Sequence, residues 1–217
     1  MDNKEIAIVI GRIREYVKSV ENPFIDRTIH KVDPFKVLVA CILSLRTKDE
    51  LTARKAPELF HIADTPEKMA ALDEERIART IYPVGFYRNK AATLRNIART
   101  LLSDYGGRVP GSIEELVKLK GVGRKTANLV VSVAFKKPAI CVDTHVHRIM
   151  NRLGYVHTKT PDKTELELRK KLPVRYWISI NNLLVRFGKK VCTPVSPRCS
   201  ECVVHKYCRR VGVSRMR

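Results

Sequence analysis

The sequence predicts an all-α fold. Apolar residues recur every three or four positions over most of the 217-residue chain, the spacing of the buried face of a helix. Short segments with Ser, Thr, Asp, Pro or Gly, the residues that begin or end helices, separate these stretches. No segment shows the convincing apolar–polar alternation of a strand. Because 44% of the residues are hydrophobic, the chain can bury a substantial core.

Start and stop signals divide the first part of the chain into helices. The apolar stripe of the first helix, which Asn22-Pro23 ends, consists of Ile6, Ile10, Ile13, Val17 and Val20. Asp33 as N-cap and Pro34 at the first position predict a second helix, whose buried run extends from Val37 to Leu45. Residues 48–60 are more polar, and they predict an amphipathic third helix.

Further helices follow with similar signals. Thr65-Pro66 and the acidic run 73–75 cap two short helices, which end near Tyr82-Pro83. Residues 88–105 predict a longer helix, whose inward residues are Ala91, Leu94, Ile97, Ala98 and Leu101. The last two sizeable helices open after Thr160-Pro161 and after Pro173.

The most informative stretch is Leu-Lys-Gly-Val-Gly-Arg-Lys-Thr-Ala at 119–127. Upstream, Ser112 as N-cap and Glu115 as its capping-box partner begin a helix. That helix is expected to stop at Gly121, since glycine tolerates the left-handed conformation that ends helices. A second helix begins directly after Gly123. Helix, tight turn and helix leave backbone N–H groups at a helix N-terminus, which suits a phosphate group.

Two candidate catalytic residues accompany this hairpin. Lys125 lies in the first turn of its second helix, and Asp143 follows 18 positions later (143 − 125), within Val-Asp-Thr-His, where it would N-cap the next helix. Taken singly, a lysine on a helix is usually solvated and an aspartate before a helix is usually a cap. A lone Gly-x-Gly turn is weak evidence for DNA binding. The combination is far more specific than its parts.

Four of the six cysteines fall within 17 residues, spaced Cys-x6-Cys-x2-Cys-x5-Cys: Cys192, Cys199, Cys202 and Cys208. The chain begins without the pattern of a secretory signal, so this clustering favours a metal group over disulfides. A zinc site commonly uses two tight ligand pairs, whereas four thiolates in one irregular loop suit a [4Fe–4S] cluster. Spacing alone leaves zinc as the alternative. Cys41 and Cys141 have apolar neighbours and are expected to be buried, inert thiols.

The charge balance predicts a polyanionic partner. Forty-two Lys and Arg against 22 Asp and Glu give a formal net charge of +20 and a pI of about 10.0, which favours nucleic acid. The cysteine loop is expected to grip the DNA backbone through Lys189, Lys190, Arg198, Lys206, Arg209 and Arg210. No apolar run approaches the length of a membrane span, so we expect an intracellular protein.

The hairpin, Val-Asp-Thr-His and the cysteine spacing together resemble the helix-hairpin-helix DNA glycosylases, most closely the endonuclease III family. The resemblance covers nearly the whole chain and implies two lobes. The first is a six-helix lobe at 27–137 that contains the helix-hairpin-helix, about 112–134. The second is an iron–sulfur cluster lobe made of 1–26 and 138–217.

The resemblance implies a bifunctional DNA glycosylase and AP (apurinic or apyrimidinic) lyase of base excision repair. Such an enzyme excises damaged, here expected to be oxidised, pyrimidines and cuts the strand 3′ of the abasic site by β-elimination. Lys125 would attack C1′ of the sugar, and Asp143 would stabilise the cationic sugar from across the cleft between lobes. The helix N-terminus, Arg124, Lys120 and partial burial would favour the neutral amine that attack requires.

Matching positions also imply DNA contacts. Arg46, followed by Thr47, stands where the family has a glutamine that fills the space left by the extruded nucleotide. Phe86 stands where the family has a leucine wedge, although a core role for Phe86 fits the sequence equally well. The hairpin contacts are Lys120, Gly121, Val122, Gly123, Arg124 and Thr126. Because Arg46 departs from the family pattern, the lesion range and the preferred opposing base stay open.

The expected partner is double-stranded DNA with a damaged base or abasic site, bound by a monomer with no membrane association. The expected location is the cytoplasm or nucleoid, or the nucleus of a eukaryote. Two alternative functions remain at this point. One is a glycosylase for uracil, thymine or a mismatched base. The other is a non-enzymatic, structure-specific DNA-binding protein that uses the hairpin and the cluster only for docking.

Overall fold

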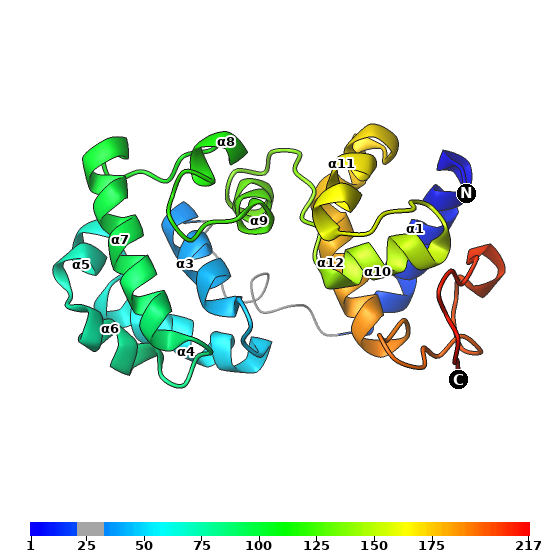
Figure 1. Ribbon diagram of the computed structural model, residues 1–217, viewed down its shortest axis with the longest axis horizontal. Helices are drawn as coiled ribbons and strands as arrows, with labels where there is room; N and C mark the ends of the chain where they lie inside the picture. Colours follow the sequence, from blue (N-terminus) through cyan, green and yellow to red (C-terminus); the bar gives the residue numbers. More distant parts are fainter. Residues whose placement is uncertain (21–32) are drawn as a thin grey trace. The chain divides into compact units, whose positions relative to one another are not determined.

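The computed structural model describes residues 1–20 and 33–217, and these residues are helical with no strand among them (Figure 1). They form two compact units, one made of 1–20 with 138–217 and the other of 33–137. The stop signal at Asn22-Pro23 and the expected lobe boundary after residue 26 lie outside the described residues. Within the described residues, no helix combines the length and the apolar character that crossing a membrane requires.

The unit of residues 33–137 holds seven helices among its described residues, against the six expected. They are α3 (Pro34–Ser44), α4 (Asp49–Ile62), α5 (Pro66–Ala71), α6 (Glu74–Ile81), α7 (Tyr87–Tyr105), α8 (Ile113–Leu116) and α9 (Arg124–Ala134). Helix α3 is the centre of this unit: it is buried from Val37 to Leu43 and packs against α4, α7 and α9. Helices α5 and α6 pack against α7.

The cap and proline signals of this unit are confirmed. The Asp33 carboxylate accepts hydrogen bonds from Phe35 N (2.8 Å) and Lys36 N (3.1 Å), and Pro34 follows at the first helical position. Thr65 and Asp73 cap α5 and α6 through their side-chain oxygens in the same way. Each cap satisfies backbone N–H groups that a helix start leaves without a partner.

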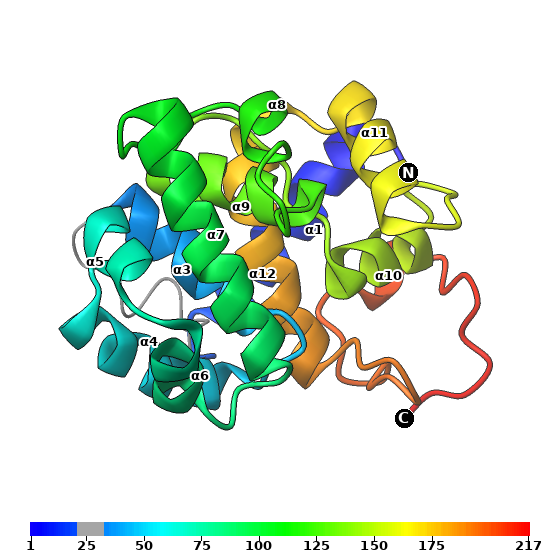
Figure 2. The same cartoon turned by 60° about the vertical axis from the view of Figure 1, so that its left-hand side comes forward.

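The other unit joins the start of the chain to its end. Its helices are α1 (Asn3–Val17), α10 (Thr144–Leu153), α11 (Pro161–Lys171) and α12 (Trp177–Lys190), with 3-10 turns at Val174–Tyr176 and His205–Tyr207. Helices α1 and α12 lie side by side in both views (Figures 1 and 2). The predicted stripe of α1 is buried here with the exception of Val20, which lies beyond the helix end and is only partly buried.

Candidate functional site

The helix before the hairpin turn is shorter than expected. Ser112 Oγ accepts a hydrogen bond from Glu115 N (3.3 Å), which confirms the N-cap. The Glu115 carboxylate, however, accepts from Tyr105 Oη (3.0 Å) and Lys118 Nζ (2.6 Å) and is drawn away from the role expected in a capping box. Helix α8 ends at Leu116, and the expectation that it continues to Gly121 was wrong. A series of tight turns covers the intervening residues.

Gly121 is required by both conformation and space. Its φ of +94° lies in the left-handed region, and a Cβ there would lie 2.6 Å from Thr93 Cγ2 on α7. Gly123 differs: it is the N-cap of α9 with φ −87°, and a Cβ there would meet nothing within 4 Å. The first glycine thus packs the turn onto α7, whereas the second leaves open space in front of α9.

The first turn of α9 presents positive charge to solvent. Lys125, Arg124 and Lys120 are all exposed, so the expected partial burial of Lys125 was wrong. Lys125 lies off the face of α9 that packs inward. Val122 and Thr126, two of the predicted hairpin contacts, are 5% and 4% exposed and are therefore buried. A helix N-terminus attracts anions, and the exposed side chains here add to that attraction.

Cys41 lies in the same unit as Lys125. Burial raises the pKa of the Cys41 thiol to about 12, while the charge of Lys125 acts in the opposite direction. Cys41 and Cys141 are each 2% exposed, so both are buried as expected. A thiol that stays protonated in this way is a poor nucleophile.

Asp143 is the N-cap of α10, as predicted. Its Oδ1 accepts hydrogen bonds from His145 N and Val146 N, both at 2.9 Å, while the residue stays half-buried. The two bonds hold the carboxylate in one orientation. Asp143 belongs to the unit of 138–217, whereas Lys125 belongs to the unit of 33–137. His147 on the same helix is structural, because its Nδ1 contacts Thr164 Oγ1 at 2.7 Å.

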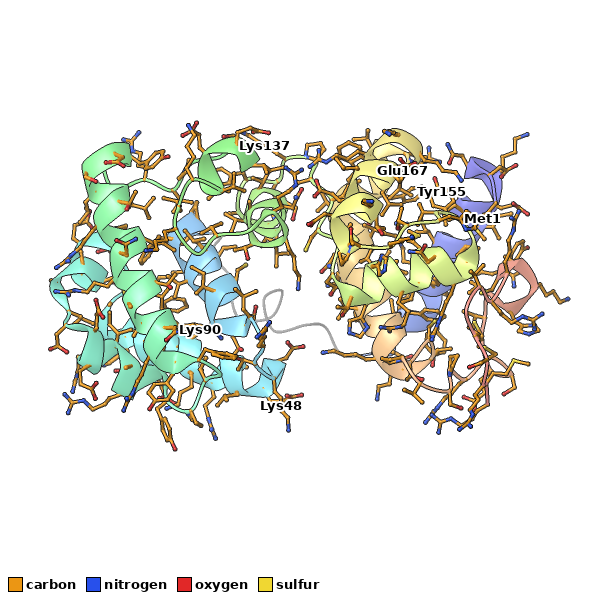
Figure 3. The ribbon with its side chains drawn as sticks, in the orientation of Figure 1. Met1, Lys48, Lys90, Lys137, Tyr155 and Glu167 are labelled. Carbon is orange, nitrogen blue, oxygen red and sulfur yellow. The ribbon has the colours of Figure 1, made fainter. Side chains whose placement is uncertain are left out.

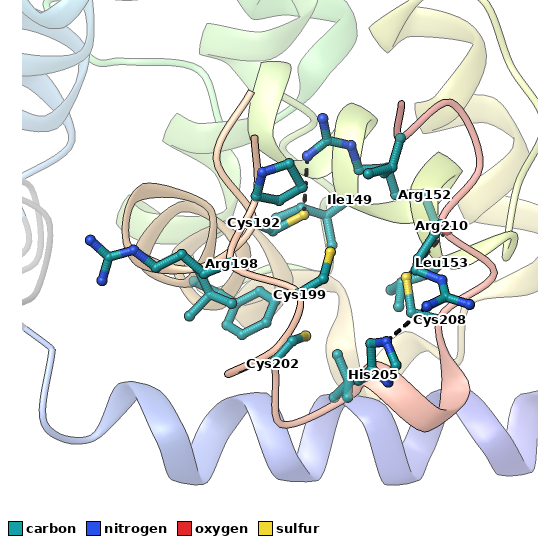
Figure 4. Close-up of a pocket in the computed structure, with 15 residues that line it drawn as sticks. Ile149, Arg152, Leu153, Cys192, Arg198, Cys199, Cys202, His205, Cys208 and Arg210 are labelled. Atoms are coloured by element: carbon teal, nitrogen blue, oxygen red, sulfur yellow. Dashed lines mark hydrogen bonds between the residues drawn. The ribbon is translucent and has the colours of Figure 1, made fainter. Parts of the chain in front are cut away.

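The four clustered cysteines line one pocket in the unit that contains α10 and α12 (Figure 4). All four are free thiols, and the apolar wall around them is formed by Ile149, Leu153, Phe187, Val191 and Val204. Burial raises the pKa of Cys202 to about 11 and raises that of Cys208, and the charges of the neighbouring cysteines act in the same direction. Such a set of thiols is unfavourable as thiolates until a cation compensates them.

Four free thiols that line one apolar pocket suit a [4Fe–4S] cluster, which distributes four thiolates over four irons. Arg152 Nη1 donates to Cys192 Sγ (3.4 Å) and Arg148 Nε to Cys192 O (3.1 Å), so positive groups support the first cysteine.

The charged residues of the cysteine loop face solvent. All six basic residues named for DNA contact are exposed: Lys189, Lys190, Arg198, Lys206, Arg209 and Arg210. His205, within the same loop, contacts Arg210 Nη1 at 2.8 Å through its Nε2. The loop therefore presents positive charge on its outer side and thiols on its inner side.

Arg46 and Phe86 form a pair that the sequence did not show. Their φ angles are +52° and +59°, and the Arg46 guanidinium carbon lies 5.5 Å from the centroid of the Phe86 ring. Phe86 is 60% exposed, which excludes the core role. Thr47, predicted to contact DNA, is only partly exposed, and its Oγ1 accepts hydrogen bonds from Gly85 N (3.2 Å) and Lys90 Nζ (3.0 Å).

Lys90 is the residue that the sequence analysis missed. It is 7% exposed, and its ammonium bonds the carbonyl oxygens of Leu43 (2.7 Å) and Leu45 (2.6 Å) as well as Thr47. One signal was available: position 90 precedes Leu94 and Ile97 by four and seven residues, so it lies on the inner face of α7.

Comparison with known proteins agrees with these features. The model of the HhH-GPD superfamily of base excision DNA repair proteins matches residues 39–174. The model of the iron–sulfur binding domain of endonuclease III matches residues 192–208. Endonuclease III of Thermotoga maritima is 47% identical over 208 residues, which cover 94% of this chain and 97% of that protein.

Solved structures show the same fold. A trapped endonuclease III–DNA covalent intermediate, an estranged-adenine complex, is 34% identical with a TM-score of 0.87, and the match covers 97% of each chain. A thermostable thymine-DNA glycosylase is 26% identical with a TM-score of 0.82, over 95% of this chain and 96% of that one.

The two hairpin glycines are expected to respond differently to the same substitution. Gly121→Ser places a side chain at φ +94° and against Thr93, so the free energy of unfolding should fall by about 1–3 kcal/mol. Gly123→Ser enters open space at an N-cap, where serine is favoured, and should change it by no more than about 0.5 kcal/mol. Denaturant unfolding of the two variants measures the difference. Equal stabilities would contradict the packing of Gly121 on α7.

Proposed function

The chain belongs to the endonuclease III family within the HhH-GPD superfamily of base excision DNA repair proteins, and on this basis we propose that it excises oxidised pyrimidines from DNA, with Lys125 as nucleophile and Asp143 as its electrostatic partner. It is a bifunctional DNA glycosylase and AP lyase with a [4Fe–4S] cluster. The observation that supports the assignment of Lys125 most is its exposed place in the first turn of α9, behind an N-cap that leaves space for a phosphate.

The reaction begins when the damaged nucleotide leaves the base stack. The hairpin backbone from Gly121 to Gly123 would bind a phosphate at the start of α9 and so bring C1′ of the sugar to Lys125. The neutral amine attacks C1′, the bond to the base breaks, and the base departs with the proton that the attacking nitrogen loses.

Strand cleavage follows from the bond that Lys125 has made. Opening of the sugar ring gives a protonated imine, which withdraws electrons from C2′. Loss of a C2′ proton then expels the 3′ phosphate by β-elimination, and water releases the product from Lys125. Asp143, held by two backbone N–H groups, would stabilise the cationic sugar as the base leaves.

We assign the cluster to Cys192, Cys199, Cys202 and Cys208. When bound, the cluster supplies iron–thiolate bonds that close the loop at 192–208. The loop then holds its exposed basic side chains in place for the phosphates of double-stranded DNA.

Arg46 and Phe86 would act in the space that the extruded nucleotide leaves. Phe86, exposed beside Arg46, would wedge between bases, and the Arg46 guanidinium would donate two hydrogen bonds to O6 and N7 of an opposing guanine. This preference supports one second candidate activity, the excision of uracil or thymine mispaired with guanine. We propose that the protein acts as a monomer on the DNA of the cytoplasm or nucleoid, or of the nucleus in a eukaryote.

Lys125→Gln should abolish covalent trapping of the protein on abasic DNA by borohydride, because glutamine forms no imine. Lys120→Gln removes a nearby exposed charge and serves as the matched control, in which trapping persists. Both variants should still bind abasic DNA in a mobility assay. Trapping of Lys125→Gln at the rate of the unmodified protein would place the nucleophile elsewhere.

Cys199→Ser should remove the broad visible absorption and brown colour of the purified protein, because a cluster ligand is lost. Cys141→Ser replaces a buried thiol outside the cysteine loop and should retain the colour. Iron and sulfide analysis on both variants provides the measurement. A colourless unmodified protein that contains one zinc per chain would contradict the [4Fe–4S] cluster, and colour retained in Cys199→Ser would contradict the ligand assignment.

Arg46→Gln should reduce the preference for lesions opposite guanine. A bidentate contact with guanine is worth about 1–3 kcal/mol, whereas adenine presents a donor at N6 that the guanidinium cannot use. The measurement compares single-turnover rates on one pyrimidine lesion opposite guanine and opposite adenine. Lys48→Gln, an exposed neighbour, controls for loss of charge. Equal guanine-to-adenine rate ratios in the unmodified protein and in Arg46→Gln would mean that Arg46 does not read the opposing base.

A further inference from the structure

The buried ammonium of Lys90 bonds the two residues that flank Arg46 in the chain, Leu45 and Thr47. Lys90 projects from the first turn of α7 (labelled in Figure 3). It donates to Leu43 O, Leu45 O and Thr47 Oγ1 at 2.7, 2.6 and 3.0 Å. An ammonium has three N–H donors, and these three acceptors use all of them.

The position of this charge is unusual for a helix. A positive group near a helix N-terminus is unfavourable, and here burial lowers the pKa of Lys90 to about 8. The compensation comes from α3: Leu43 lies in its last turn and Leu45 is its C-cap, where carbonyl groups lack helical partners and attract cations. The ammonium therefore joins the start of α7 to the end of α3.

The contacts of Lys90 enclose Arg46 on both sides. Leu45 and Thr47, the residues before and after Arg46, are both bonded to the Lys90 ammonium. On the other side, the backbone N–H of Lys90 donates to Phe86 O (3.0 Å), and Gly85 N donates to Thr47 (3.2 Å).

The two loops also approach closely at their backbones. A Cβ on Gly85 would lie 2.6 Å from the Arg46 carbonyl oxygen. Arg46 and Phe86 both adopt the left-handed conformation, which is uncommon for residues other than glycine. The buried Lys90 side chain and the close approach of Gly85 to the Arg46 carbonyl hold the two residues adjacent to each other.

We infer that Lys90 is a positioning residue that assembles Arg46 and Phe86 into one preformed element before DNA binds. The inference rests on the proposed role of these two side chains in the opened base stack. A preformed pair loses little conformational entropy on insertion, and this lowers the cost of binding distorted DNA. Lys90 itself touches neither the lesion nor the reacting atoms in this account.

The test is a mutant cycle on the full-length, cluster-loaded protein. Lys90→Met removes the ammonium but keeps an unbranched side chain, and it is placed in the unmodified protein and in the Arg46→Ala/Phe86→Ala background. Affinity is measured for a duplex that carries a non-cleavable abasic analogue opposite guanine. We expect Lys90→Met to lower the affinity about 10-fold when it is the only substitution, which is the size of one lost base contact. In the Arg46→Ala/Phe86→Ala background, we expect Lys90→Met to lower the affinity by less than about 2-fold.

Two controls separate positioning from a general loss of stability. Ile97→Ala lies two turns further along α7, is buried, and should destabilise the unit while it changes affinity by less than about 2-fold. Gly85→Ala disturbs the same loop contact without removing a charge, and it should reproduce the loss and the non-additivity of Lys90→Met. A 2-aminopurine base beside the abasic analogue should lose its fluorescence change with Lys90→Met even at saturating protein.

The outcomes are distinct. An equal fold-loss in both backgrounds, or no loss in either, would overturn the positioning role of Lys90. If Arg46→Ala/Phe86→Ala alone binds the abasic duplex as well as the unmodified protein does, the proposed DNA contact is wrong, and the inference falls with it.

Discussion

The close contact between Gly121 and Thr93 is the constraint on which the arrangement of the hairpin depends. With φ at +94° and no room for a Cβ, the turn can lie only against α7, and this fixes where α9 begins. Helix α9 then packs on α3, the buried centre of its unit. Lys125 lies in the first turn of α9. Its position therefore depends on the close packing of Gly121 on Thr93, although neither of these residues is catalytic. The chemistry thus depends on a residue that has no side chain.

Two helix starts are used in opposite ways. At α10 the N-cap carboxylate of Asp143 occupies the N–H groups of the first turn, and those bonds orient the group that is proposed to face the cationic sugar. At α9 the N-cap is Gly123, which supplies no side-chain cap and leaves the approach open. The start of α10 thus binds the Asp143 carboxylate, whereas the start of α9 is open to a DNA phosphate. The same electrostatic property of a helix end therefore serves orientation in one unit and binding in the other.

Much of the fold could be predicted because caps and prolines act locally. Asp33-Pro34, Thr65-Pro66 and Asp143 begin helices at the residues expected, and the buried stripe of α7 follows its apolar spacing. The differences at Glu115 and Lys90 come from tertiary contact. The Glu115 carboxylate accepts a hydrogen bond from Tyr105 and does not complete the capping box expected of it. Lys90 is buried because α3 ends opposite it with carbonyl acceptors.

The candidate site divides in the same way. Spacing identified the four cysteines and the hairpin glycines, since metal ligands and tight turns impose short-range patterns. The contact between Arg46 and Phe86 could not be predicted, because it depends on two loops 40 residues apart (86 − 46) that meet through Gly85 and Lys90. The division of the chain into two units likewise has no signature in helical periodicity.

The proposed chemistry requires that Lys125 forms the covalent bond to the sugar. Digestion of the borohydride-trapped complex with a protease and a nuclease, followed by mass spectrometry of the modified peptide, locates that bond. A reduced sugar remnant is expected on Lys125. A remnant on Lys120, or on any other lysine in place of Lys125, would contradict that chemistry.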